Sequence, residues 1–163
     1  MNDANPQPFA ALDACHLQIQ KYMEELQCMA GHMESRGLSE SDRKLAGEIE
    51  SFFSGTSREH HAQEEAQVFP ALLATGSEEV KAAVRSLQQD HGFIEENWIE
   101  IGPQLRAIAH GNDWFLAEEF QHNVAVFLEL LSGHIALEES MIYPESKAQW
   151  AAAVAGRKAR LAH

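Results

Sequence analysis

The sequence has few cysteines, and their positions leave no room for a disulfide framework. Only Cys15 and Cys28 occur among 163 residues. Both lie in one expected helix, where their separation corresponds to roughly 20 Å, too far for a disulfide between them. Because unpaired thiols are typical of reducing compartments, we expect a cytoplasmic protein.

Long apolar runs and basic residues are scarce as well. No uninterrupted apolar run reaches about 18 residues, so we expect no membrane-spanning segment. The start, MNDANPQPFAAL, lacks the basic and apolar regions of a signal peptide. The chain has 12 lysines and arginines against 25 aspartates and glutamates, a formal net charge of −13. This balance argues against nucleic acid as a partner and makes metal cations a natural one.

Strand signals are also scarce, whereas helical periodicity extends along the chain. The 45% apolar and 23% charged residues are typical of a globular protein, and 163 residues suit one domain spanning 1–163. Apolar residues at three-, four- and seven-residue steps predict four helices. They run from Leu12 to near Gly37, from Ser39 to Leu72, from Ser77 to the turn at 110–113, and from Phe120 to near Pro144.

Smaller signals refine these helices. Ser39 with Asp42 resembles a capping box, SGTS at 54–57 predicts a local distortion, and Gly102-Pro103 predicts a kink. The alanine-rich tail predicts a short terminal helix. The expected fold is all-α, an up-down-up-down antiparallel four-helix bundle with a short C-terminal helix.

Each predicted helix carries a histidine where its apolar face requires a core residue. These are His16, His60, His91 and His134. For any one of them, the simpler interpretation is a core imidazole that pairs with a neighbouring carbonyl or carboxylate. Four unpaired buried imidazoles would be costly for a domain of this size, so a set with one per helix predicts convergence on a common partner.

A repeated motif supports that interpretation. HHAQEEAQVFP at 60–70 recurs as HIALEESMIYP at 134–144, and each copy follows a lone histidine by a similar distance. The chain is therefore expected to form two related helical hairpins. The four-residue step places His60 with Glu64, and His134 with Glu138, one turn apart on one face. Each glutamate could then bridge to a second ion, which predicts a two-metal site.

Other polar residues near the motifs are weaker candidates for metal ligands. Glu95 follows His91 by four residues, so it is either a terminal metal ligand or a partly exposed salt-bridge partner. Glu65 and Glu139 are rotated by about 100° from the site face and are expected to be partly exposed or to support the ligands from outside. His61 also lies off that face and is not expected to bind metal.

The order of histidine, HxxxE, histidine, HxxxE over four antiparallel helices resembles the haemerythrin-like family, which carries the HHE cation-binding domain. The resemblance covers about residues 8–145, the expected core of the domain. It implies a non-haem di-iron centre with a bridging oxo or hydroxo group, in which manganese or zinc could replace the two Fe ions. The implied terminal ligands are His16, His60, His91 and His134, and the implied bridges are Glu64 and Glu138.

The sequence departs from the invertebrate oxygen carriers of that family, which have HxxxH on the third helix and HxxxxD on the fourth. Here the two motifs are His91-xxx-Glu95 and His134-xxx-Glu138. Exchanging an imidazole for a carboxylate favours the ferric state, which makes reversible oxygen carriage doubtful. If Glu95 binds, one coordination position stays open for a small molecule. We therefore expect a protein that binds or senses O2, NO or peroxide, or handles iron.

Two other classes of function compete with that expectation. The first is a di-iron enzyme for peroxide or NO detoxification or for iron-centre repair. The second is a zinc site or a plain interaction bundle. No HExxH motif occurs, and the six or seven nitrogen and oxygen groups suit octahedral iron or manganese better than tetrahedral zinc.

Overall fold

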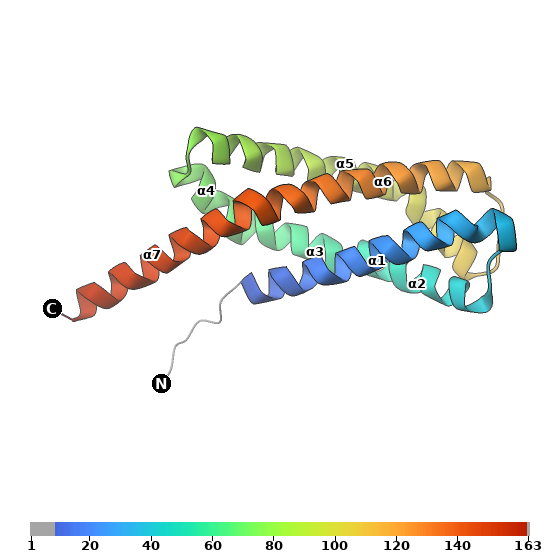
Figure 1. Ribbon diagram of the computed structural model, residues 1–163, viewed down its shortest axis with the longest axis horizontal. Helices are drawn as coiled ribbons and strands as arrows, with labels where there is room; N and C mark the ends of the chain where they lie inside the picture. Colours follow the sequence, from blue (N-terminus) through green and yellow to red (C-terminus); the bar gives the residue numbers. More distant parts are fainter. Residues whose placement is uncertain (1–8, 163) are drawn as a thin grey trace.

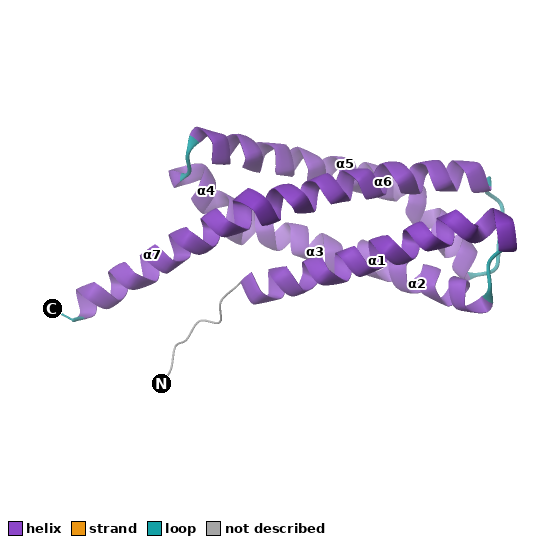
Figure 2. Ribbon diagram, viewed as in Figure 1, coloured by secondary structure: helices purple, strands orange, loops and turns teal. Residues whose placement is uncertain are grey.

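The computed structural model describes residues 9–162 of the chain. The first eight residues, which include most of the stretch where no signal peptide is expected, and His163 lie outside the described residues. Within the described part the chain is helical apart from short loops and contains no strand, so the prediction of an all-α fold is confirmed. Four rods lie side by side, and short loops join them (Figures 1 and 2).

The four rods follow the predicted order, although two of them are interrupted internally. The first rod is α1 (Phe9–Arg36) and the third is α5 (Glu78–Ala109). The second rod consists of α2 (Glu40–Ser54), α3 (Thr56–Gln63), η1 (Glu64–Val68) and α4 (Phe69–Thr75). The fourth consists of α6 (Ala117–Leu137), η2 (Glu138–Ile142) and α7 (Tyr143–Leu161). Both η segments are π-helical and begin at the glutamate of an HxxxE motif.

The signals for helix starts and for the distortion are confirmed. Ser39 and Asp42 form a reciprocal capping box at the start of α2, and the Ser77 side chain caps α5. Gly37, with φ of 72°, adopts the left-handed conformation between α1 and α2 that favours glycine. The second rod breaks between α2 and α3 at Gly55, inside the SGTS stretch.

One expectation about helix ends needs correction, although Pro103 does not end the third helix. The third helix continues through Gly102-Pro103, where the sequence predicts a kink. The carbonyl left without its usual donor by Pro103 belongs to Ile99, a 64% exposed residue, so water can replace that hydrogen bond. The C-terminal helix is not a separate short element. It is α7, which continues the fourth rod for 19 residues and projects past the end of the bundle (Figure 1).

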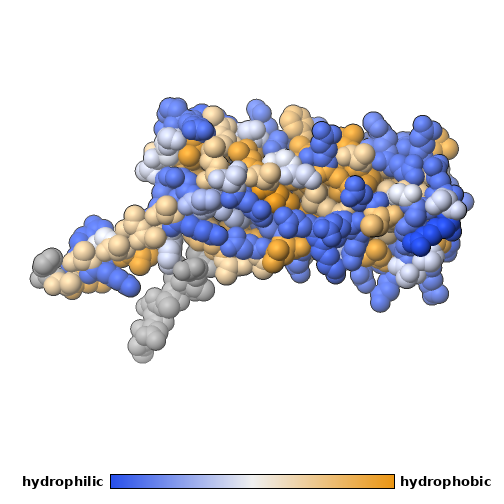
Figure 3. Space-filling model, viewed as in Figure 1, coloured by the Kyte–Doolittle hydropathy of each residue, from blue (hydrophilic) through white to orange (hydrophobic). Residues whose placement is uncertain are grey.

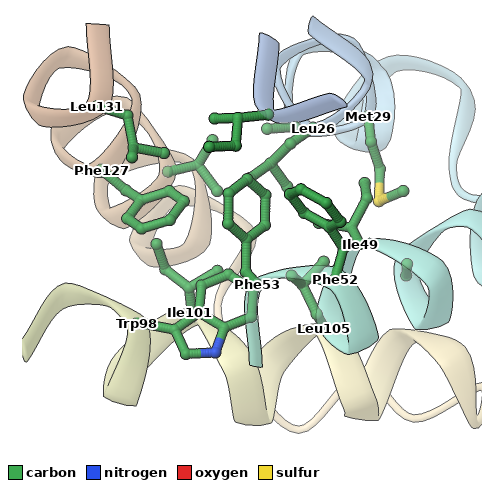
Figure 4. Close-up of a cluster of buried hydrophobic side chains, with 14 of the residues drawn as sticks. Leu26, Met29, Ile49, Phe52, Phe53, Trp98, Ile101, Leu105, Phe127 and Leu131 are labelled. Atoms are coloured by element: carbon green, nitrogen blue, oxygen red, sulfur yellow. The ribbon is translucent and has the colours of Figure 1, made fainter. Parts of the chain in front are cut away.

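The hydrophobic core is divided into two clusters, and the predicted histidines lie between them. One cluster surrounds Phe53, Trp98 and Phe127 (Figure 4). The other includes Phe69 and Leu87. On the second and third rods the histidine falls where one cluster ends and the other begins, and on the first and fourth rods it lies at the edge of the first cluster, beside Cys15 and Ile135. For example, His91 follows Leu87 of the second cluster and precedes Ile94 of the first. The site is therefore enclosed by apolar packing at both ends.

The outer surface fits this arrangement. Hydrophilic residues cover much of the visible face of the bundle, with apolar residues between them (Figure 3). Beyond its first residues, α7 is largely exposed, and its buried residues are Tyr143 and Ser146. Of the described helices, none is both long and apolar enough to cross a membrane.

Candidate metal centre

The structure brings the six strongest sequence candidates together in the interior. The four histidines and both glutamates are buried, and Glu64 and Glu138 have no exposed surface. Their ligand atoms form two neighbouring groups, in each of which all atoms lie within 4.8 Å of one another. We call the group around His16 and His60 the first pole and the group around His91 and His134 the second pole.

The two buried carboxylates each reach both poles. Glu138 places Oε2 2.9 Å from Nε2 of His16 and Oε1 3.0 Å from Nε2 of His134. Glu64 places Oε1 3.0 Å from Nε2 of His60 and Oε2 3.4 Å from Nε2 of His91. Each carboxylate therefore directs one oxygen to each pole, which is the arrangement of a bridging ligand.

Several buried polar atoms at the site have no hydrogen-bond partner in the described part of the chain, which indicates whether a cation would fit there. Both oxygens of Glu138, Oε2 of Glu64 and Nε2 of His91 and His134 are buried without a hydrogen-bond partner among the described residues. Buried polar atoms are nearly always paired, because leaving one unpaired costs about 1–3 kcal/mol. Here the unpaired atoms converge on shared space, and imidazole nitrogens with carboxylate oxygens are ligands that suit iron or manganese. The residues fit a pair of metal ions.

Buried charges also affect the titration of these groups. Burial raises the pKa of Glu64, but the nearby imidazoles of His60 and His91 outweigh it and hold that pKa far below its usual range. Burial lowers the pKa of His60, whereas the side chains of Cys15 and Glu64 raise it, with a net result of about 10. Without a metal, His60 therefore carries a proton, which a metal ion bound there would replace.

His61, which the sequence placed off the site face, belongs to the second pole. Its side chain is buried, and its ring stacks on His91 at 4.3 Å between centroids. It groups with Glu64, His91 and His134 as a potential ligand. Burial, followed by the charges of His91 and His134, lowers the pKa of His61 to about 2, so its imidazole is neutral and able to bind metal.

A comparison of the two copies of the repeated motif could have indicated that His61 is buried. The corresponding residue of the second copy is Ile135, an apolar residue that is also buried. Both positions after the first histidine of the motif therefore face the interior. A rotation of 100° around α3 moves a side chain from the first pole to the second and does not move it to the surface.

Glu95 is not brought into either group. Its carboxylate accepts hydrogen bonds from Nε of Arg58 at 3.0 and 2.8 Å, and Nη2 of Arg58 lies 2.8 Å away. Both side chains are partly exposed. Of the two interpretations of Glu95, the structure shows the salt bridge. His61, rather than Glu95, lies among the potential ligands of the second pole.

The second glutamate of each motif, Glu65 or Glu139, lies outside the site and supports one of its histidines. This agrees with the expectation from the sequence. Nδ1 of His91 lies 2.8 Å from Oε1 of Glu65, and Nδ1 of His16 lies 3.2 Å from Oε1 of Glu139. An Nδ1–H that donates to a carboxylate leaves Nε2 with its lone pair directed at the site. These outer carboxylates therefore fix the tautomer that metal binding requires.

The π-helical segments determine which aromatic residue reaches each pole. The backbone N–H of Phe69 bonds to the carbonyl of Glu64, and that of Tyr143 bonds to the carbonyl of Glu138, each across five residues. The prolines that follow, Pro70 and Pro144, have no N–H for the four-residue bond of an α-helix. Residues five apart thus lie one turn apart, and each aromatic side chain comes over the site.

The two aromatic residues occupy opposite poles and differ in chemistry. The ring of Phe69 lies against His91 at the second pole, with 5.7 Å between centroids. The hydroxyl of Tyr143 lies at the first pole, 3.1 Å from Nε2 of His16, and donates a short hydrogen bond to Glu64. Burial, followed by the charges of Glu64 and Glu138, raises the pKa of the Tyr143 phenol.

Two surface grooves lie beside the first pole. One, of about 490 Å³, lies between α1 and α3 and is lined by Cys15 and His60 among others. The other, of about 350 Å³, lies between α1 and α7 and is lined by Glu139 and Tyr143 among others. The first pole is therefore separated from these grooves only by the side chains that line them.

Comparisons with known proteins agree with this site. The model of the hemerythrin HHE cation binding domain matches residues 7–146. A protein of Haemophilus influenzae, described as uncharacterized, is 25% identical over 139 residues, which cover 83% of this chain and 76% of that protein. No solved structure matched the chain.

Proposed function

Because the chain belongs to the hemerythrin HHE cation-binding family, we propose that it holds two iron ions at the two poles and binds or senses a small diatomic or peroxide ligand there. Manganese and zinc are possible substitutes for iron. The proposal depends above all on the two buried carboxylates, since each of them directs one oxygen to each pole.

The proposed ligands follow from the distances. At the first pole they are His16 and His60, and at the second pole they are His91, His134 and His61. Glu64 and Glu138 bridge the poles. We do not include Glu95, because its carboxylate is engaged with Arg58 at the surface.

The chain's own residues would prepare the site for metal in three ways. Glu65 and Glu139 orient the imidazoles of His91 and His16 by accepting their Nδ1–H groups. The two hydrophobic clusters keep bulk water away from the site. The grooves at the first pole admit a small molecule. Iron bound there would supply a redox-active cation with an exchangeable coordination position.

Binding, sensing and iron handling require only what the described residues provide: a closed metal site with a narrow approach. A di-iron enzyme for peroxide or NO detoxification or for iron-centre repair is the second candidate, and the approach to the first pole would serve it equally. We propose the cytoplasm as the location, because Cys15 and Cys28 are both free thiols.

Metal content and visible absorption test the proposal directly. We expect full-length protein loaded with ferrous iron and exposed to air to retain about two irons per chain and to develop the absorption of a bridged ferric pair. His134→Ala should lose this absorption, whereas His122→Ala, which alters an exposed histidine on the same helix, should keep it. Wild-type protein that retains far less than two irons per chain would refute the proposal.

Peroxide and NO consumption separates the two candidates. A binding or sensing protein should take up about one equivalent of ligand per site and then stop. Continued turnover by wild-type protein that is absent in His134→Ala would instead favour the enzyme.

A further inference from the structure

The hydroxyl of Tyr143 lies among the ligand atoms of the first pole. Its oxygen is 3.1 Å from Nε2 of His16 and 3.5 Å from Nε2 of His60, and it contacts Oε1 of Glu64. A tyrosine that only anchors a carboxylate needs a single acceptor. This phenol instead faces three atoms, each of which is proposed to bind the same ion.

These separations match those between neighbouring ligands of one ion. With metal–ligand bonds of about 2.1 Å, adjacent corners of an octahedron lie about 3 Å apart. The proposed ligands already show this spacing: Oε2 of Glu138 lies 2.9 Å from Nε2 of His16, and Oε1 of Glu64 lies 3.0 Å from Nε2 of His60. The phenol oxygen extends the same pattern.

The two poles have unequal numbers of donors if Tyr143 is not counted. Each pole has two histidines, one from each of two helices, and one oxygen from each of Glu64 and Glu138. His61 adds a further donor to the second pole. The residue that corresponds to His61 in the other half of the repeat is Ile135, which cannot bind metal, so the first pole lacks this donor unless Tyr143 supplies it.

We propose that Tyr143 is an oxygen ligand of the ion at the first pole and that an incoming small ligand must displace it. This proposal rests on the proposed metal site but goes beyond it, because it assigns a phenolate to a centre otherwise made of imidazoles and carboxylates. On binding, the phenol O–H bond breaks, its proton passes to solvent, and the oxygen binds the metal without any change in the oxidation state of the iron.

A phenolate bound to ferric iron gives a visible charge-transfer absorption that imidazoles and carboxylates do not give. We expect this band in ferric wild-type protein and in Tyr22→Phe, which removes the other tyrosine hydroxyl of the chain. It should be absent from Tyr143→Phe, with about two irons per chain in all three proteins. Resonance Raman spectra of the wild-type protein should show phenolate ring vibrations, a readout that requires no variant to fold.

Azide titration distinguishes a displaced ligand from a hydrogen-bond donor. If Tyr143 occupies the position that azide needs, azide should bleach the phenolate band, and Tyr143→Phe should bind azide roughly ten-fold tighter or more. If the hydroxyl only donated a hydrogen bond to the bound anion, the same variant would bind azide more weakly, and the proposal would be wrong.

The remaining outcomes are also decisive. Iron-loaded wild-type protein without phenolate vibrations would overturn the role of Tyr143 while the proposed di-iron site stands. Wild-type protein that does not retain iron would overturn both proposals, and the metal analysis of that one sample separates the two failures.

Discussion

The two poles of the centre share a frame but differ in three positions. Each has a lone histidine, a motif histidine, an oxygen from both carboxylates and an outer glutamate that holds an Nδ1–H. The first pole adds a phenol and lies beside two grooves. The second adds a third imidazole and a phenyl ring. A repeated sequence can thus build a common scaffold while single substitutions give its two metal positions different chemistry.

The differences arise at corresponding places in the two halves. His61 stands where the other half has Ile135, and Phe69 stands where the other half has Tyr143. The residue before each lone histidine differs too. At the first pole, the side chain of Cys15 raises the pKa of His60. At the second pole, Oδ2 of Asp90 lies 3.5 Å from Nδ1 of His134.

Removing a carboxylate that both poles share should weaken metal binding at both poles, and this is the largest effect that we expect. Glu64→Gln keeps the size of the side chain but removes its charge and one ligand oxygen. Since Glu64 reaches both poles, we expect iron content to fall from about two ions to less than about one per chain. Elemental analysis after desalting measures this.

Glu95→Gln is the matched control, because Glu95 lies on the bundle but is paired with Arg58. It should retain the iron content of the wild type. Equal iron in Glu64→Gln and Glu95→Gln would show that the buried carboxylate does not bridge.

Removing the third imidazole should weaken the second pole alone. In His61→Leu we expect the second-pole ion to be held at least about ten-fold more weakly, while the first-pole ion is retained. A chelator challenge should then show one fast and one slow phase of iron release. His122→Leu, at an exposed position of α6, should release iron as the wild type does. Release from His61→Leu that is indistinguishable from the wild type would exclude His61 as a ligand.

The outer glutamates provide the smallest and most selective change. Glu65→Gln should weaken the second pole and Glu139→Gln the first, each by roughly 10- to 100-fold. The effect of Glu65 should be the larger, since it lies 2.8 Å from its histidine against 3.2 Å for Glu139. Chelator release of iron from the two single variants measures both effects.

Double variants show which ion each glutamate supports. His61→Leu combined with Glu139→Gln should give additive effects, because the two changes act at different poles. His61→Leu combined with Glu65→Gln should not, because both act at the second pole. The opposite pattern would mean that the outer glutamates support the poles in the reverse order.

Most of the fold and of the shared frame could be predicted from sequence periodicity. A histidine at a core position of each helix, together with HxxxE at a four-residue step, is enough to place both imidazole and carboxylate inside. The capping box at Ser39 and the break near Gly55 are also local, because short-range hydrogen bonding and glycine conformation produce them.

The features that distinguish the poles could not be predicted in the same way. The position of Tyr143 depends on a π-helical turn, and a regular α-helical step from Glu138 would direct its side chain elsewhere. His61 depends on which neighbouring helices flank α3. Glu95 remained ambiguous because the position of Arg58, on another rod, decides whether a salt bridge forms. The outcomes for His61 and Glu95 are set by packing between helices that local sequence does not encode.

The way the two hairpins interleave determines when the centre can form. Glu138 and Tyr143 of the second hairpin reach His16 of the first, and the Tyr143–His16 contact spans 127 positions along the chain. During synthesis on the ribosome, the N-terminal hairpin would emerge with imidazoles but without half of its oxygen donors. Metal capture is therefore a late event in folding, and an ion once captured closes a loop over most of the polypeptide, as a cross-link between its distant ends would.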